Sequence, residues 1–188
     1  MIAKGLDFPR VTLVGIVYAD VGLHLPDFRS GERAFQQITQ VAGRAGRGEV
    51  AGEVIIQTFT PDHLAIRMGR RQDFEGFYRE ETRFRKELDY PPFNHFTKIE
   101  CASTQERQAE FMAAHLRQLL EERAGKALRI LGPCPAPLGR VRVRHRIHLL
   151  LRDGRLKRPK DILRDILAAL PRNKEVLVSA DVDPMQML

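Results

Sequence analysis

Two consecutive prolines, Pro91 and Pro92, constrain the fold of this 188-residue chain more than any other feature. Proline has no backbone N–H and its ring clashes with the preceding helical turn, so a helix cannot continue through the pair. An amphipathic, helical pattern over 62–88 stops in front of them, and a different rhythm of apolar residues follows. We therefore predict a boundary there, with residues 1–60 and a helical connector over 61–90 before it and a second domain over 91–188.

The residues before the prolines have the pattern of an α/β sheet. The β-branched run over 11–20 predicts a buried, parallel strand, and Gly and Pro residues over 22–31 predict a loop. A helix is expected over 32–42, with Ser30 as its start and Gly43 and Gly46 as its end. Residues 52–59 predict a second strand, which completes the repeating unit of an α/β fold.

The residues after the prolines predict a separate α+β domain. Alternating or apolar runs indicate strands over 95–102, 128–131, 141–152 and 175–182, and helical spacing indicates helices over 105–123 and 159–170. The resulting order, β-α-β-β-α-β, is typical of a ferredoxin-like domain. The stretch GPCPAPLG over 132–139 is too rich in proline to be expected in regular structure.

Composition limits the classes of protein that this chain can belong to. Hydrophobic residues make up 43% and charged residues 29%, which is typical of a globular protein, and no apolar run is long enough to span a membrane. The N-terminus has no secretory pattern, so we expect a cytoplasmic protein. Cys101 and Cys134 are too few for a disulfide framework or a four-cysteine zinc site, and no set of metal ligands is expected.

Positive charge is concentrated in the second half of the chain. The net charge is +7, and residues 126–160 contain eleven Lys or Arg against one acid, Asp153. Such a local excess attracts phosphate backbones or an acidic peptide, although it could also be a solvated basic surface. Alternation over 141–148 would place Arg142, Arg144, Arg146 and His148 on one face of a strand, with Val141, Val143, His145 and Ile147 on the other.

A pair of arginines follows the first predicted helix. Arg44 and Arg47 lie in the sequence QVAGRAGR, which starts at Gln40, and their guanidinium groups could bind a phosphate together. Gly and Arg are also favoured at any helix C-terminus, so the spacing alone fits a helix cap equally well. A second polar segment with Lys4, Gly5 and Asp7 precedes the first strand, at an edge of the predicted sheet.

Together these segments resemble helicase motifs. AKGLDFPRVTLVGIVYAD, residues 3–20, is similar to motif V of superfamily 2 helicases, and QITQVAGRAGRG, residues 37–48, is similar to motif VI. The segments GLHLPDFRSGERAFQ, GEVIIQTF, YPPF, LGP and DVDP extend the likeness along essentially the whole chain. The chain resembles the C-terminal part of the PriA family (primosomal protein N-prime), which are bacterial replication-restart helicases.

The resemblance implies that residues 1–60 form part of a second RecA-like helicase lobe. Arg44 and Arg47 would be catalytic, one of them as an arginine finger. The cofactor-binding residues for ATP and Mg²⁺ would be Gly5, Asp7, Gln40 and Gly43. Lys4 would contact DNA. A Gly-Lys-Thr/Ser loop is absent, because the one Gly-Lys pair, at Gly125, is followed by alanine. We therefore expect a fragment without ATPase activity of its own, whose nucleotide loop and the family's zinc sites lie upstream.

The same resemblance implies that the C-terminal domain binds DNA and protein partners. The expected ligands are forked and single-stranded DNA, the acidic tail of single-stranded DNA-binding protein and other primosome proteins, and no membrane. The candidate binding residues are Arg140, Arg142, Arg144, Arg146 and His148. One alternative is a stand-alone module that binds nucleic acid or single-stranded DNA-binding protein without enzymatic activity; another is a fragment of an RNA helicase.

Overall fold

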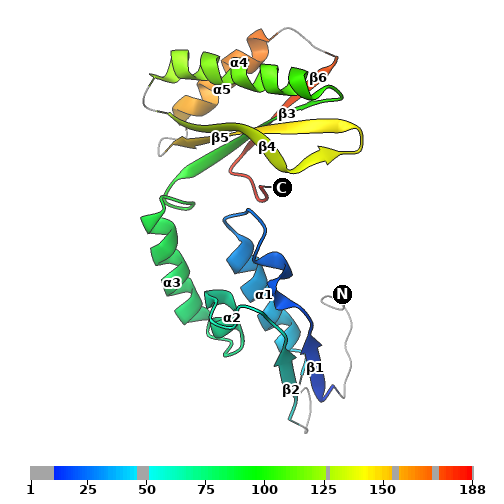
Figure 1. Cartoon of the computed structure of the whole chain (residues 1–188). Helices are drawn as coiled ribbons and strands as arrows, with labels where there is room; N and C mark the ends of the chain where they lie inside the picture. The colour runs from blue at the N-terminus through cyan, green and yellow to red at the C-terminus, as the bar shows by residue number, and fades with distance from the viewer. Residues whose placement is uncertain (1–10, 46–50, 126–127, 154–156, 171–173, 188) are drawn as a thin grey trace. The chain divides into compact units, whose positions relative to one another are not determined.

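A computed structural model describes residues 11–45, 51–125, 128–153, 157–170 and 174–187. The chain divides into two compact units, Met1–Phe84 and Arg85–Leu188 (Figure 1). The division falls inside helix α3 (Phe74–Glu87), six residues before Tyr90, where the chain turns towards the two prolines. Each unit has its own hydrophobic core, and each is described separately below.

The first unit contains a two-stranded parallel sheet whose strands are connected through an α-helix. Strands β1 (Leu13–Ile16) and β2 (Glu53–Ile56) pair in parallel, and helix α1 (Ser30–Ala42) connects them after the short 3₁₀ helix η1 (Ala19–Gly22). The prediction of a strand–loop–helix–strand order is confirmed. Helix α1 begins at Ser30 and buries the apolar residues that its helical spacing predicts, Ala34, Phe35, Ile38 and Ala42.

The strands of the first unit are less buried than predicted. Leu13 of β1 and Ile55 of β2 are 58% and 54% exposed, so the expectation of a buried strand over 11–20 is wrong for the described residues. Parallel strands become buried when neighbouring strands and helices cover them on both faces. In the described part of this unit, β1 pairs with β2 alone, so half of the side chains stay exposed.

A single helix over 62–88 was expected, but the structure has two. Helix α2 (Leu64–Gly69) ends before Gln72, whose φ of 53° is left-handed and cannot belong to a helix. Asp73 then starts helix α3, since its carboxylate accepts a hydrogen bond from the Gly76 backbone N–H at 2.8 Å. Among the aromatic residues of α3, Phe77 is buried against Phe35, whereas the others are exposed: Phe74, Tyr78 and Phe84.

A buried carboxylate joins the segments that follow β1 and β2. Asp20 in η1 accepts hydrogen bonds from the hydroxyl groups of Thr58 and Thr60 at 2.8 and 2.5 Å. It also accepts from the backbone N–H groups of Phe59 and Thr60 at 3.0 and 3.1 Å. The Thr60 hydroxyl is the largest cause that lowers the pKa of Asp20, to about 2, and these bonds outweigh the opposing effect of burial. Asp20 therefore joins the two segments as an acceptor that is ionised at neutral pH.

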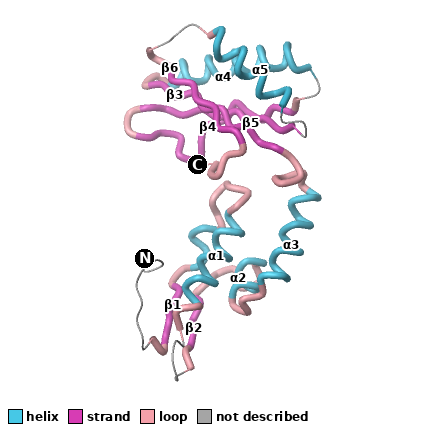
Figure 2. Tube along the Cα trace, turned by 180° about the vertical axis from the view of Figure 1, so that it is seen from behind, coloured by secondary structure: helices cyan, strands magenta, loops and turns pink. Residues whose placement is uncertain are grey.

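The second unit is a four-stranded antiparallel sheet with two helices. The elements follow in the order β3 (His95–Ser103), α4 (Glu106–Ala124), β4 (Arg129–Val141), β5 (Arg144–Asp153), α5 (Lys157–Ala169) and β6 (Val176–Val182). The strands lie in the order β4-β5-β3-β6, and both helices pack on one face (Figures 1 and 2). The predicted sequence of elements, β-α-β-β-α-β, is confirmed.

Two boundaries in this unit differ from the predictions. Strand β4 continues through the proline-rich stretch 132–139, which was expected to be irregular. It can do so because β4 is an edge strand, where proline removes no needed ladder bond, and because its pairing with β5 shifts register twice. Strand β5 starts at Arg144 rather than at 141, because Arg142 and Val143 form a tight turn and Arg142 has a φ of 56°.

The core of the second unit lies between the sheet and its helices. Ile99 and Cys101 of β3 and Leu149 of β5 face Leu116 and Leu120 of α4, and all of these side chains are fully buried. Burial also raises the pKa of the Cys101 thiol to about 12, so this cysteine stays protonated within the core. None of the helices that the structure describes is long and apolar enough to cross a membrane.

We predict that Leu149→Ala lowers the free energy of unfolding of the second unit by about 2–5 kcal/mol, because it removes buried methyl groups and leaves a cavity. Urea unfolding followed by circular dichroism measures the effect, since the chain has no tryptophan. Leu177→Ala is the matched control, because Leu177 is 53% exposed and its loss should cost less than about 0.5 kcal/mol. Equal losses in the two variants would contradict this description of the core.

Candidate functional sites

The predicted nucleotide site lies at the C-terminal end of helix α1. Gly43 caps the helix, and its backbone N–H donates to the Thr39 carbonyl at 3.0 Å. The next amide, that of Arg44, donates to the Val41 carbonyl, also at 3.0 Å. Gln40 and Gly43 are exposed and Arg44 is half-buried. The carbonyl groups at a helix C-terminus carry partial negative charge, which stabilises a guanidinium group placed there.

Helix α1 connects two parallel strands, so it runs against their direction and its C-terminal end faces the side of the sheet where β1 and β2 begin. At the same edge, the Glu53 backbone N–H donates to the Thr12 carbonyl at 2.7 Å. Ligands of open α/β sheets usually bind at the opposite edge, outside the carboxyl ends of the strands. The general rule for such sheets therefore does not support a ligand site here, and the hypothesis rests on the motif resemblance.

The other residues predicted for this site lie outside the described residues: Lys4, Gly5, Asp7 and Arg47. The structure thus places Gln40, Gly43 and Arg44 together at one helix end. Two features suit a phosphate-bearing ligand: Gln40 and Gly43 are exposed at the surface, and Arg44 carries a positive charge.

The second predicted site lies on strand β5. Ile147 and Leu149 point towards the helices, so alternation places Arg144, Arg146 and His148 on the opposite face of the sheet. Lys98 and Glu100 of β3 lie on this face too, because Glu100 is directly opposite His148. We call these five residues the charged face.

Two of the candidate binding arginines, Arg140 and Arg142, do not lie on the charged face. Arg142 lies in the turn between β4 and β5 rather than on a strand, so it has no place in the alternation. Arg140 is paired with His145, whose ring lies 3.7 Å from Glu106 at the start of α4. Directly paired residues share a face, so Arg140 belongs to the side of the helices. The expectation that Arg142 shares a strand face with Arg144, Arg146 and His148 is therefore wrong, while the binding roles of Arg140 and Arg142 stay predictions.

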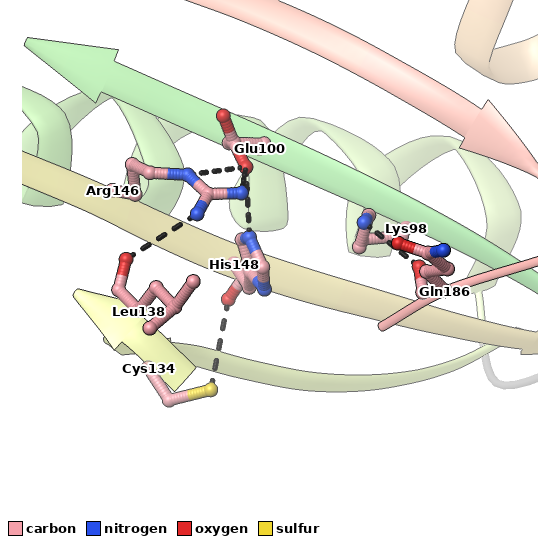
Figure 3. Close-up of polar contacts among 7 residues, drawn as sticks. All are labelled: Lys98, Glu100, Cys134, Leu138, Arg146, His148 and Gln186. Carbon is pink, nitrogen blue, oxygen red and sulfur yellow. Dashed lines mark hydrogen bonds and ion pairs between the residues drawn. The ribbon is translucent and has the colours of Figure 1, made fainter. Parts of the chain in front are cut away.

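An acid that was not among the predicted site residues organises the charged face. A single oxygen of Glu100, Oε2, accepts hydrogen bonds from Arg146 Nε at 2.9 Å and from another nitrogen of the same guanidinium group at 2.5 Å. The same oxygen lies 3.0 Å from His148 Nε2 (Figure 3). The side chains of Glu100, Arg146 and His148 are only 21%, 14% and 8% exposed. Two of the predicted ligand-binding residues are thus already bound to an internal carboxylate.

Burial and hydrogen bonding act on these groups in opposite directions. Burial raises the pKa of the Glu100 carboxyl, but hydrogen bonds from Arg146 and His148 outweigh it and hold the pKa below its ordinary value. Burial lowers the pKa of His148, and the hydrogen bond and charge of Glu100 offset only part of this effect. At neutral pH the group therefore contains an ionised Glu100, a charged Arg146 and a neutral His148.

Further contacts attach the charged face to its surroundings. Arg146 also donates to the Leu138 carbonyl of β4 at 3.3 Å, and Lys98 Nζ donates to the Gln186 carbonyl of the C-terminal segment at 3.0 Å (Figure 3). Arg144 is different. Its Nη1 is buried but has no hydrogen-bond partner within the described ranges of the chain.

Sequence reasoning missed Glu100 because its role depends on which strands are neighbours. The alternation over 95–103 is visible in the sequence and places Lys98 and Glu100 on one face. The register that brings Glu100 opposite His148, 48 residues later, follows only from the pairing of β3 with β5.

Comparison with known proteins identifies the family. Residues 86–185 match the family described as the primosomal protein N C-terminal domain. The matched residues make up more than half of the chain. The chain belongs to this family. It is 40% identical to replication restart protein PriA of Bacillus subtilis and 41% identical to that of Synechocystis, and both alignments cover all of this chain. The protein of the same name from Treponema pallidum is 39% identical, again over the whole chain.

The matched relatives are much longer than this chain. It spans 24% of the Bacillus protein, 22% of the Synechocystis protein and 29% of the Treponema protein. The alignments include residues 1–85, which precede the matched domain, so the likeness extends across both units.

We predict that the His148 ring titrates below pH 6.5 and that Glu100→Gln lowers its midpoint further, because the variant loses the charge that favours the imidazolium ion. Because the folded protein favours the neutral ring, the stability that His148 contributes is complete above pH 6.5 and is lost as the pH falls through its folded pKa. NMR titration of the ring protons measures both midpoints. The resonances of His115, on helix α4, should be the same in the two proteins. A higher midpoint in Glu100→Gln would contradict the assignment.

Proposed function

We propose that this chain is the C-terminal portion of a bacterial ATP-dependent 3′–5′ DNA helicase, which recognises stalled forks and restarts replication by primosome assembly. The observation that carries this proposal is the match of the entire chain to proteins named replication restart protein PriA. The motif V and motif VI segments over 3–20 and 37–48 support the helicase activity. We also propose a cytoplasmic location, where replication forks are found in bacteria.

The first unit is proposed to be part of the second RecA-like lobe of that helicase. Support comes from the parallel pairing of β1 with β2 and from helix α1, which returns the chain between them. In the full-length enzyme, ATP and Mg²⁺ would lie between two lobes. Gln40, Gly43 and Arg44 would approach the nucleotide from this lobe together with Arg47, and Gly5 and Asp7 would link it to the DNA contact of Lys4. This chain alone is expected to hydrolyse no ATP, since it contains no Gly-Lys-Thr/Ser loop.

The arginines would act on the charge that develops in phosphoryl transfer. A guanidinium group is permanently protonated and planar, so it can bind two phosphate oxygens and stabilise the negative charge of the transition state. The bound nucleotide with Mg²⁺ supplies the transferable phosphoryl group. Arg44 directly follows Gly43, the C-terminal cap of α1, so the helix end fixes where the Arg44 backbone lies.

We predict that Arg47→Ala in the full-length protein lowers DNA-stimulated ATPase activity by about 10³-fold or more and abolishes unwinding, because an arginine finger typically contributes 10³–10⁵ in rate. Steady-state ATPase and fork-unwinding assays measure the effect, and fork binding should be retained. Arg71→Ala is the matched control, because Arg71 is an exposed cation of the same unit outside the motif. Normal ATPase activity in Arg47→Ala would overturn the proposed role.

A second function is proposed for the C-terminal unit, that of a docking module. The observation that favours it is the charged face, which combines cations with the exposed apolar side chains of the neighbouring hairpin, Leu138, Val141 and Val143. An acidic peptide with an apolar terminal residue and a free carboxylate would complement such a surface. The acidic tail of single-stranded DNA-binding protein has this chemistry. Forked and single-stranded DNA and other primosome proteins are the further partners that we propose.

We predict that this chain binds a fluorescein-labelled acidic tail peptide of single-stranded DNA-binding protein saturably, as measured by anisotropy. Because surface charges are screened by salt, the affinity should fall between 50 and 500 mM NaCl. The control is a peptide with the same residues in scrambled order, so that the apolar residue no longer stands at the C-terminus. This peptide should bind more weakly. If the chain binds single-stranded DNA but no peptide, the surface binds the phosphate backbone of nucleic acid and the proposed protein partner is wrong.

A further inference from the structure

Glu100 is a carboxylate placed among the cations that are proposed to bind a carboxylate. We propose that Glu100 determines the specificity of the charged face: it holds Arg146 and His148 on the sheet, so that Arg144 is the residue that anchors an acidic peptide. This inference rests on the proposed docking function of the C-terminal unit. It divides the cations of that face into two classes, which the sequence alone does not distinguish.

Arg146 and His148 have the first role, which is internal. Both nitrogens that Arg146 directs towards β3 donate to Glu100 Oε2, and the opposite side of its guanidinium group donates to the Leu138 carbonyl. His148 is 8% exposed and uses its Nε2 on the same carboxylate oxygen. A ligand carboxylate could reach these two groups only by displacing Glu100, which carries the same charge and is already in place.

Arg144 has the second role, which is to meet the ligand. It lies two residues before Arg146 on the same strand, so alternation places it on the same face, next to the turn. Its Nη1 is buried without a hydrogen-bond partner in the part of the chain that the structure describes. A buried cationic N–H group without an acceptor is unfavourable, and a ligand carboxylate would satisfy it. Arg144 is also paired across the hairpin with Val141, which provides apolar surface beside the guanidinium group.

This arrangement favours a peptide over a nucleic-acid strand. Phosphates repeat along a nucleic acid and are bound by cations in a row, but here Glu100 neutralises the cation next to Arg144. Proteins that bind single strands also stack bases on aromatic rings. The hairpin residues 129–153 contain no Phe, Tyr or Trp, and those exposed near its turn are aliphatic: Leu138, Val141 and Val143. One carboxylate beside an apolar side chain matches this surface better than a series of phosphates.

The test compares four variants of this chain for binding to the labelled acidic tail peptide and to a labelled single-stranded dT20. Arg144→Gln should weaken peptide binding about tenfold, the typical effect of losing a charge-assisted hydrogen bond. Arg146→Gln should weaken it clearly less than Arg144→Gln does, because it removes no contact to the peptide and acts only by leaving the Glu100 charge unbalanced. Glu100→Gln should strengthen peptide binding about threefold to tenfold, and should strengthen dT20 binding with a steeper salt dependence, because it releases Arg146.

Asp181→Asn is the matched control for Glu100→Gln. Asp181 is an exposed acid of β6 that pairs with Lys98, so it lies on the same face as Glu100, and no ion pair or hydrogen bond joins it to Arg146 or His148 among the described contacts. The Asp181→Asn substitution removes the same charge as Glu100→Gln and should change the peptide affinity by less than about twofold. Circular dichroism and melting temperature verify that each variant is folded, and Glu100→Ala replaces Glu100→Gln should the latter unfold.

The outcomes separate this inference from the proposed function. If the unmodified chain and Glu100→Gln both bind neither probe, the docking function itself is wrong. If the unmodified chain binds the peptide but Arg146→Gln weakens binding as much as Arg144→Gln, or Glu100→Gln binds no better than Asp181→Asn, the division of roles is overturned and the docking function stands. Tighter binding of dT20 than of peptide by the unmodified chain would overturn the choice of a peptide ligand.

Discussion

The alternation of side chains along the paired strands β3 and β5 determines both the core and the charged face of the C-terminal unit. Ile99 and Cys101 must face Leu149 and the two helices, because this is where apolar surface can be removed from water. Because side chains alternate along a strand, Lys98 and Glu100 then lie on the other face of the sheet. A shift of one residue in the pairing of these strands would bury the charges and expose the core, so the hydrophobic register also fixes the position of every charged group on this face.

The limited exposure of the charged face explains why Glu100 is paired with Arg146 and His148. A guanidinium group that is 14% exposed has lost much of its hydration and requires acceptors within the protein. Glu100 supplies one and the Leu138 carbonyl supplies another. Replacing one member of such a group leaves the others with buried, unsatisfied charge, so its members depend on one another. The pairing that keeps these side chains in place is also the reason why their charges do not all remain for a ligand.

The parts of the fold that sequence reasoning predicted correctly are those with a local period. The buried positions of α1 follow from helical spacing, and the β-α-β-β-α-β order follows from alternation and helical spacing between proline and glycine. The errors arise where a residue's environment depends on distant parts of the chain. The stretch 132–139 extends as a strand because β4 lies at the edge of the sheet, and the roles of Arg140 and Glu100 depend on strand register. Neither edge position nor register can be inferred from residues that are neighbours in sequence.

The two candidate sites show that an arginine's surroundings decide what its charge can do. Arg44 follows a helix C-terminus, where the carbonyl groups themselves favour a cation. Arg146 lies in the middle of a sheet, where strand dipoles largely cancel, so its charge needs a carboxylate. The excess of arginine over 126–160 consequently overstates the positive charge of this surface: Arg140 and Arg142 lie off the charged face, and Glu100 balances Arg146. The number of basic residues in the strand therefore does not by itself give the charge of this surface, because internal ion pairs offset part of it.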